Sequence, residues 1–159
     1  MSRYRIFILS ICSLFAFQAF AGDLKSDLKD ILTVNQRAFT QNDLKKFMAT
    51  TTASPMILDE FPPFTWSGKN SATTYVKDFK EITAKFKMTD FKVEVKDPTS
   101  FEQTPNAVYA VFPITVNYKD GDMKIHTDDG FQTVVFKKSA SNTWLIEHSA
   151  WTITNKNPK

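Results

Sequence analysis

Residues 71–95 read SATTYVKDFKEITAKFKMTDFKVEV, and the period of their apolar positions changes near the middle of this stretch. Up to Phe86 the apolar positions recur at the spacing of one helix face, with Ser71 placed to cap the helix. After Lys87 the apolar residues alternate with charged ones, which predicts a strand with one face in the core and one in water. The stretch therefore predicts a helix followed directly by a strand.

The rest of the chain extends this order in both directions. The apolar positions of residues 24–48 recur at spacings of three, four and seven, which is typical of an amphipathic helix. Asn42-Asp43 is typical of the cap of a second, short helix. Further strands are expected at residues 55–58, 106–119, 123–137 and 144–154. Because helices come first and antiparallel strands follow, the chain is predicted to be α+β, with the helices packed in a strongly bent antiparallel sheet.

The N-terminus has the three parts of a secretory signal peptide. Two arginines precede the apolar residues 6–17, and Ala19-Phe20-Ala21 is a small-x-small cleavage site. The apolar stretch is shorter than the roughly 20 residues that a transmembrane helix needs. We therefore predict that residues 1–21 are removed and that residues 22–159 form one exported domain, periplasmic or secreted, without a membrane anchor.

The composition restricts the chemistry of this domain. The chain has 159 residues, 42% of them hydrophobic, which suits one globular domain rather than a disordered or multidomain chain. The single cysteine, Cys12, falls in the predicted signal peptide, so disulfides and thiolate chemistry are not expected. Basic residues are interleaved with acidic ones, which argues against nucleic-acid binding. His126 and His148 lie on separate expected strands and do not amount to a zinc ligand set, so no metal and no cofactor are expected.

Three segments, in their order and spacing, resemble the nuclear-transport-factor-2-like superfamily, in particular its SnoaL-like and ketosteroid-isomerase-like branch. They are Gln41-Asn42-Asp43-Leu44, the stretch from Pro55 through Trp66-Ser67-Gly68-Lys69 into the Tyr75 helix, and the final hairpin with Gly130-Phe131 and residues 144–149. The resemblance covers nearly all of residues 24–154. It implies a cone-shaped, cystatin-like fold with an apolar pocket, and a homodimer through the outer sheet face. The superfamily includes isomerases, cyclases, dehydratases and hydrolases, so the fold does not determine the function.

Asp59 is the first candidate catalytic residue. It precedes an aromatic, proline-rich loop, and its spacing of nine residues to Gly68 resembles that of the general base in ketosteroid isomerases. An apolar environment would raise the pKa of such a carboxyl and make it a better base near neutral pH. Glu60 is the adjacent alternative, and because neighbouring strand residues point in opposite directions, only one of the two is expected to face the pocket. A solvated loop carboxylate or a helix-capping residue is the other interpretation of Asp59.

Asp129 is the second candidate catalytic residue. Its parity along the expected strand is that of four apolar residues, which places it on the apolar side. These residues are Met123, Ile125, Phe131 and Val135. By its position before Gly130-Phe131, Asp129 resembles the protonated aspartate that donates a hydrogen bond to the enolate oxygen in ketosteroid isomerases. A bulge at Gly130 would reverse the parity and expose Asp129, so both placements stay open.

Two further polar residues are candidates to line the pocket. Asn35 lies on the apolar face of the first helix, where a polar side chain must line a cavity or bond to a neighbouring backbone group. In the ketosteroid isomerases a tyrosine of the oxyanion hole stands at this position, so this chain departs from their pattern. His148 shares the parity of Trp144 and Ile146 and is expected to line the pocket or to make a hydrogen bond in the core.

The sequence thus favours an exported SnoaL-like domain that binds an apolar small molecule in an internal pocket. The expected ligand-binding residues are Asn35, Phe61, Phe64, Trp66, Tyr75 and His148. The alternative is an isomerase, cyclase or dehydratase that abstracts a proton beside a carbonyl. In that enzyme Asp59 is the base, and Asp129, Asn35 or His148 is the hydrogen-bond donor. A second alternative is a dimeric protein-interaction module that uses the open sheet face.

Overall fold

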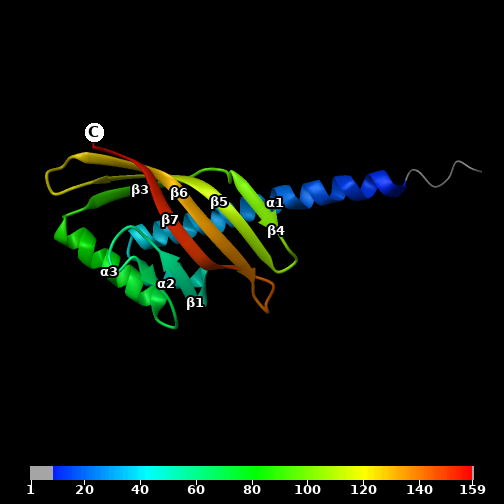
Figure 1. The fold of residues 1–159 in the computed structure, drawn as a ribbon, viewed down its shortest axis with the longest axis horizontal. Coiled ribbons are helices and arrows are strands. Elements are labelled where there is room, and N and C mark those ends of the chain that lie inside the picture. Colours follow the sequence, from blue (N-terminus) through cyan, green and yellow to red (C-terminus); the bar gives the residue numbers. More distant parts are fainter. Residues whose placement is uncertain (1–8, 159) are drawn as a thin grey trace, which may run out of the picture.

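A computed structural model describes the backbone of residues 9–158 and the side chains of residues 24–155 (Figure 1). The predicted signal peptide, residues 1–21, lies outside the residues whose side chains are described. In chain order, the elements are α1 (Leu9–Thr40), α2 (Leu44–Ala49), β1 (Thr51–Leu58), β2 (Thr65–Trp66), α3 (Ser71–Lys85), β3 (Thr89–Val95), β4 (Ser100–Gln103), β5 (Ala107–Lys119), β6 (Ile125–Lys138) and β7 (Trp144–Pro158). Among the described residues, no helix is long and apolar enough to cross a membrane.

The strands form one seven-stranded sheet in the order β2-β1-β7-β6-β5-β3, with β4 paired to β5 beside this path. The long strands β5, β6 and β7 are consecutive antiparallel neighbours that curve over α1 (Figure 1). β1 pairs with β7 in parallel, so the sheet is mixed and mostly antiparallel rather than purely antiparallel. The α+β prediction, with N-terminal helices packed against a bent sheet, is confirmed.

The sequence stretch that predicts a helix and a strand forms α3 and β3. The helix begins one residue earlier than expected, because Asn70 rather than Ser71 occupies the cap position. The Ser71 hydroxyl instead donates a 2.6 Å hydrogen bond to the carbonyl of Pro55, which ties α3 to β1. Asp43 caps α2 as predicted, since its carboxylate accepts a hydrogen bond from the Lys46 N–H at 3.1 Å.

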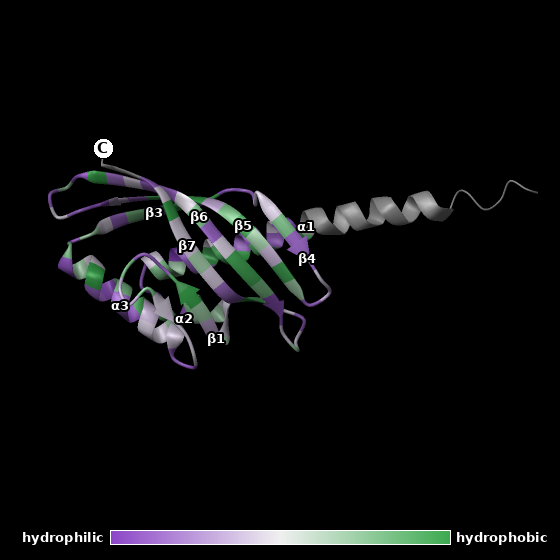
Figure 2. Cartoon of the chain, in the orientation of Figure 1, coloured by the Kyte–Doolittle hydropathy of each residue, from purple (hydrophilic) through white to green (hydrophobic). Residues whose placement is uncertain are grey.

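Much of β5 and part of β6 is hydrophobic (Figure 2), and buried positions alternate with more exposed ones along both strands. The even-numbered residues 108–114 of β5 and 128–136 of β6 are buried, whereas their odd-numbered neighbours are more exposed. The even-numbered residues therefore face the concave side of the sheet, which packs on α1. This parity decides which side chains can reach an internal site.

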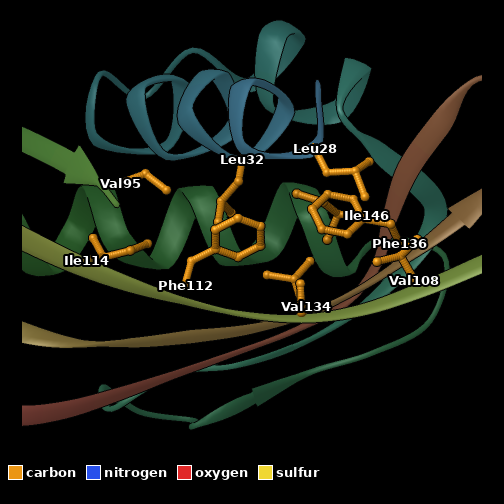
Figure 3. Close-up of a cluster of buried hydrophobic side chains, with 10 residues drawn as sticks. Leu28, Leu32, Val95, Val108, Phe112, Ile114, Val134, Phe136 and Ile146 are labelled. Atoms are coloured by element: carbon orange, nitrogen blue, oxygen red, sulfur yellow. The ribbon is translucent and has the colours of Figure 1, made fainter. Parts of the chain in front are cut away.

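Two apolar clusters fill the concave side. The first packs α1 against β5 and β6 (Figure 3), and its members are Leu28, Leu32, Val95, Val108, Ala110, Phe112, Ile114, Val134, Phe136 and Ile146. The second joins α1, α2 and α3 through aromatic rings, and its members are Ala38, Phe39, Phe47, Ile57, Trp66, Ala72, Tyr75, Val76 and Phe79. The candidate site lies beside the second cluster, which shares Phe39, Tyr75 and Phe79 with it.

Candidate functional site

A cavity of about 140 Å³ lies between α1, α3 and the concave face of the sheet. The apolar residues that line it are Phe39, Phe61, Phe79, Ile82, Met88, Phe91, Val116 and Trp151. Its amide and hydroxyl residues are Gln36, Thr40, Tyr75, Tyr118 and Gln132, and its acidic residues are Asp59, Glu60 and Asp128. Among the residues whose side chains are described, no basic one belongs to the lining. The site is thus an aromatic chamber with acidic groups in its wall.

The loop after β1 brings Asp59, Glu60 and Phe61 to the cavity. The Asp59 N–H donates to the Phe64 carbonyl at 3.1 Å, and the Phe64 N–H donates to the Phe61 carbonyl at 2.9 Å, so the loop closes on itself. β1 ends at Leu58, and strand alternation does not continue into the loop. Both Asp59 and Glu60 therefore line the cavity, and the prediction that only one of them faces it is wrong.

Asp59 is held by a buried tyrosine of α3. The Tyr75 hydroxyl donates a 2.5 Å hydrogen bond to Oδ2 of Asp59, and the Glu60 N–H donates to Oδ1 at 2.7 Å. Burial raises the pKa of Tyr75 well above its usual value of 10.0, and the negative charge of Asp59 raises it further. Tyr75 therefore keeps its proton and acts as a charge-assisted donor to the carboxylate.

A second tyrosine and carboxylate form a similar pair on β5 and β6. Tyr118 donates a hydrogen bond to Asp128, which is 8% exposed. Burial, and then the charge of Asp128, raises the pKa of Tyr118 to about 12. The Tyr118 ring also stacks on His126, whose Nε2 lies 2.7 Å from Oδ2 of Asp120. The cavity thus has two carboxylates that are each oriented by a tyrosine hydroxyl.

Stacked rings hold the apolar wall in place. Phe39 packs on Phe79 with ring centroids 4.0 Å apart and stacks on Tyr75 at 4.4 Å. Phe79 meets Phe91 at 5.5 Å, and Phe91 stacks on Tyr118 at 5.4 Å. Aromatic pairs in these ranges add stability beyond the area that they bury. The wall is therefore a continuous set of rings from α1 to β5, and it connects the two tyrosine–carboxylate pairs.

Of the predicted site residues, Asp59, Phe61 and Tyr75 line the cavity, while their roles stay predictions. Trp66 lies behind Tyr75, edge-on at 4.8 Å, and its Nε1–H donates to Oδ2 of Asp78 at 2.8 Å. It is buried and supports the wall without lining the cavity. Phe64 is 55% exposed and also lies outside the lining, so neither aromatic residue has the predicted place.

Asn35 does not line the cavity either. It is buried, and its amide Nδ2 donates a 2.8 Å hydrogen bond to the Thr50 hydroxyl. That hydroxyl in turn donates to the Phe47 carbonyl at 2.7 Å. Asn35 therefore joins α1 to the end of α2, which is a structural role close to the alternative that the sequence left open. The next residue of α1, Gln36, lines the cavity in its place.

Of the two placements that the sequence left open for Asp129, the structure has the one outside the cavity. Its Oδ1 accepts a 2.7 Å hydrogen bond from Thr115, a residue outside the cavity lining, and Asp128 is the residue that faces the cavity. The argument for the pocket placement relies on apolar residues that share the parity of Asp129. In the structure these residues include exposed ones, such as Met123 at 65% and Ile125 at 45%. The correct signal was present in Val134 and Phe136, which are fully buried and share the parity of Asp128 and Gln132.

His148 is displaced from the pocket by an irregularity of β7. Phe136 pairs with Ile146, whereas Val135 pairs with His148, so Glu147 is an extra residue in the ladder. This bulge reverses the parity after Ile146, and the His148 side chain is 44% exposed and absent from the cavity lining. From β7, Trp151 lines the cavity instead.

No protein-family model and no curated protein matches this sequence. The structure, however, is similar to solved structures over most of its length. A hexachlorocyclohexane dehydrochlorinase of Novosphingobium barchaimii has a TM-score of 0.72 and 10% identity, covering 91% of this chain and 94% of that one. A ketosteroid isomerase-like protein of Erwinia carotovora has a TM-score of 0.61 and 15% identity, covering 79% of this chain and 92% of that one.

A nuclear-transport-factor-2-like superfamily protein of Salmonella enterica has a TM-score of 0.69 and 15% identity, covering 86% of this chain and 95% of that one. The chain therefore has the nuclear-transport-factor-2-like fold, as its sequence segments predict. At identities this low the similarity concerns the fold alone, and the function has to be argued from the cavity.

Proposed function

We propose that this domain binds a small organic molecule in the cavity between α1, α3 and the sheet. The observation that supports the proposal most directly is the cavity itself, since it remains open although aromatic side chains surround it. A cavity of about 150 Å³ in another protein binds benzene or xenon, so this one suits a ligand of about one ring. The two tyrosine–carboxylate pairs supply fixed polar groups of the kind that orient ligands.

The proposal predicts that filling the cavity abolishes ligand binding. Val116 lines the cavity on β5, so Val116→Phe places a ring in the space that the ligand needs. Val111 lies on the same strand outside the lining, and Val111→Phe is the matched control. Ligand-observed NMR with neutral, cationic and anionic one-ring fragments should detect binding to the unmodified domain and to Val111→Phe, and no binding to Val116→Phe. Equal binding by both variants, or none by any protein, would reject the proposal.

An enzyme that abstracts a proton beside a carbonyl is the second candidate function. It is favoured by the position of Asp59, which lines the same cavity as Tyr118. However, both oxygens of Asp59 accept hydrogen bonds, which a base must share or give up to receive a proton. If Asp59 is the base, Asp59→Asn should reduce turnover of an active carbonyl substrate at least about 100-fold with the fold intact. Unchanged turnover would exclude this role.

We also propose, from the sequence, that the mature domain is exported and that two copies associate through the outer sheet face. Support for the second point comes from exposed apolar residues on that face, among them Tyr109 at 43% and Phe131 at 38%. Exposed apolar residues that gather on one sheet face are a common feature of interfaces. Sedimentation analysis of the domain without residues 1–21 tests the association, and a monomer at high concentration would reject it.

A further inference from the structure

We infer that the ligand of the cavity is an alcohol or a phenol of about one ring, held by a hydrogen bond that its hydroxyl group donates to the lining. This inference rests on the proposed binding function and names the chemical class of the ligand. It is carried by the hydroxyl side chains of the lining, which are Thr40, Tyr75 and Tyr118. Each of them already uses its proton within the protein, so each can only accept a hydrogen bond from a ligand.

The two tyrosine hydroxyls donate to carboxylates of the lining. Tyr75 donates to Asp59 at 2.5 Å, and Tyr118 donates to Asp128. The pKa values of both tyrosines are raised, so these protons stay in place at neutral pH. A hydroxyl group has one proton and two lone pairs, so an oxygen whose proton is used can only accept from a further group. Turning the proton toward a ligand would take a charge-assisted donor away from a carboxylate, which is costly in a partly enclosed site.

The third hydroxyl belongs to Thr40, at the end of α1. It donates to the carbonyl of Gln36, one turn earlier, at 3.1 Å, and the Arg37 carbonyl lies at 3.2 Å. Threonine side chains in helices often bond to the backbone in this way, and the bond uses the only proton of the hydroxyl. Among the lining residues that the structure describes, all three hydroxyl oxygens therefore offer lone pairs, and no proton, to a ligand that reaches them.

The other uncharged polar groups of the lining contain N–H donors. Gln36 and Gln132 carry amides, which donate and accept, and Trp151 carries an indole N–H, which only donates. The carboxylates of the lining, which already interact within the protein, add acceptors and no donors. A ligand hydroxyl can use both kinds of group, because it donates to one oxygen and accepts from an N–H. A ketone or an ether can only accept, so it leaves the hydroxyl oxygens of the lining unused.

The volume and the apolar part of the lining set the rest of the ligand. The cavity of about 140 Å³ is close in size to a cavity of about 150 Å³ that holds benzene. Its apolar residues, among them Phe61, Ile82 and Val116, suit a hydrocarbon ring. A charged group loses much more hydration than a hydroxyl when it enters such a site. An uncharged aromatic alcohol or phenol therefore matches the cavity in size and in hydrogen bonding.

The experiment compares molecules of similar shape with and without a hydroxyl group. 1-Phenylethanol is paired with acetophenone, and phenol is paired with fluorobenzene. Dissociation constants are measured by NMR titration of the domain without residues 1–21. At least one hydroxyl compound is expected to bind about fivefold more tightly than its partner, which is the size of effect expected for one hydrogen bond. Partners that bind as tightly as both hydroxyl compounds would overturn the ligand class and leave the proposed binding function standing.

Single variants assign the preference to the hydroxyl oxygens of the lining. Thr40→Val, Tyr75→Phe and Tyr118→Phe each remove one of them and keep the rest of the side chain nearly unchanged. In at least one variant the affinity ratio of 1-phenylethanol to acetophenone should fall about threefold or more. The ratio is the readout because a general loss of stability affects both compounds alike.

Two matched controls remove hydroxyls outside the lining. Thr33 makes the same kind of bond in α1, to the Lys29 carbonyl at 2.8 Å, and Tyr109 is an exposed tyrosine of β5. Thr33→Val and Tyr109→Phe should leave the affinity ratio unchanged. A ratio that stays constant in all three cavity variants would overturn the inferred hydrogen bond. If no member of either pair binds to the unmodified domain, the proposed binding function itself fails.

Discussion

Gly130→Ala is expected to destabilise the domain by about 1–3 kcal/mol and to weaken ligand binding together with it. A Cβ at Gly130 would collide with the backbone carbonyl of Thr152, and it would lie 2.7 Å from the ring of Trp151. A backbone carbonyl in a paired strand cannot move without disturbing the ladder, so β7 must shift. Because Trp151 lines the cavity, the same shift changes the binding site.

The matched control for this variant is Gly121→Ala. The nearest atoms to a Cβ there would be Cδ and Cβ of the exposed Lys87, at 3.1 and 3.2 Å, so a shift of a few tenths of an ångström is enough to relieve the contact. Its expected effect is within about 0.5 kcal/mol. Urea unfolding gives the stabilities and the fragment titration gives the affinities. If Gly121→Ala lowers the free energy of unfolding as much as Gly130→Ala does, the close approach of Gly130 to β7 has no special effect.

A comparison of residues 71–95 with strands β6 and β7 shows why the sequence predicts the fold better than the site. The helix and strand periods of residues 71–95 are strong local signals, and they correspond to α3 and β3. Within residues 71–95 the errors are confined to the ends of the elements, where the local pattern is weakest. Phe86, for example, continues the apolar helix face, but α3 ends at Lys85 and Phe86 is 56% exposed. Two short strands, β2 and β4, lack enough residues to show a period.

The site depends on which face of each strand is internal, and alternation alone does not decide this. Both faces of β6 carry apolar residues, with Phe131 exposed at 38% and Val134 fully buried. The direction of the Asp129 side chain is therefore decided by tertiary packing and not by the local sequence pattern. In β7, the bulge at Glu147 inverts the parity of His148 without any sequence signal. The predicted residues that line the cavity, Asp59, Phe61 and Tyr75, belong to a loop and a helix, where strand alternation does not apply.

Tyr75→Phe is expected to reduce the free energy of unfolding by about 1.5–3 kcal/mol near neutral pH, as is typical for a lost hydrogen bond to a charged group. The substitution keeps the ring that stacks on Phe39 at 4.4 Å and removes only the hydroxyl that donates to Asp59. Asp59 then loses the donor that fixes its Oδ2. We therefore expect weaker binding of cavity ligands, because the carboxylate is no longer held in one orientation.

The pH dependence tests whether the Tyr75 hydroxyl is buried beside a carboxylate, because burial first and the charge of Asp59 second raise its pKa. The pKa of Tyr75 is raised above 10.0 in the folded domain, so above about pH 10 the folded state holds a proton that the unfolded state releases. This contribution to stability is complete below pH 10 and is lost as the pH rises through the folded value. Tyr118, with a pKa of about 12, contributes with the same sign. The stability gap between the unmodified domain and Tyr75→Phe should therefore narrow above pH 10.

Tyr109→Phe is the control, since Tyr109 is 43% exposed and its hydroxyl makes no hydrogen bond among those of the described residues. It should change stability by less than about 0.5 kcal/mol at any pH. Urea unfolding between pH 7 and 11, followed by circular dichroism, measures all three proteins. A constant gap between the unmodified domain and Tyr75→Phe across this range would mean that the hydroxyl acts through packing. Asp59 would then not be oriented by a charge-assisted bond, and the cavity would lose one of its two fixed carboxylates.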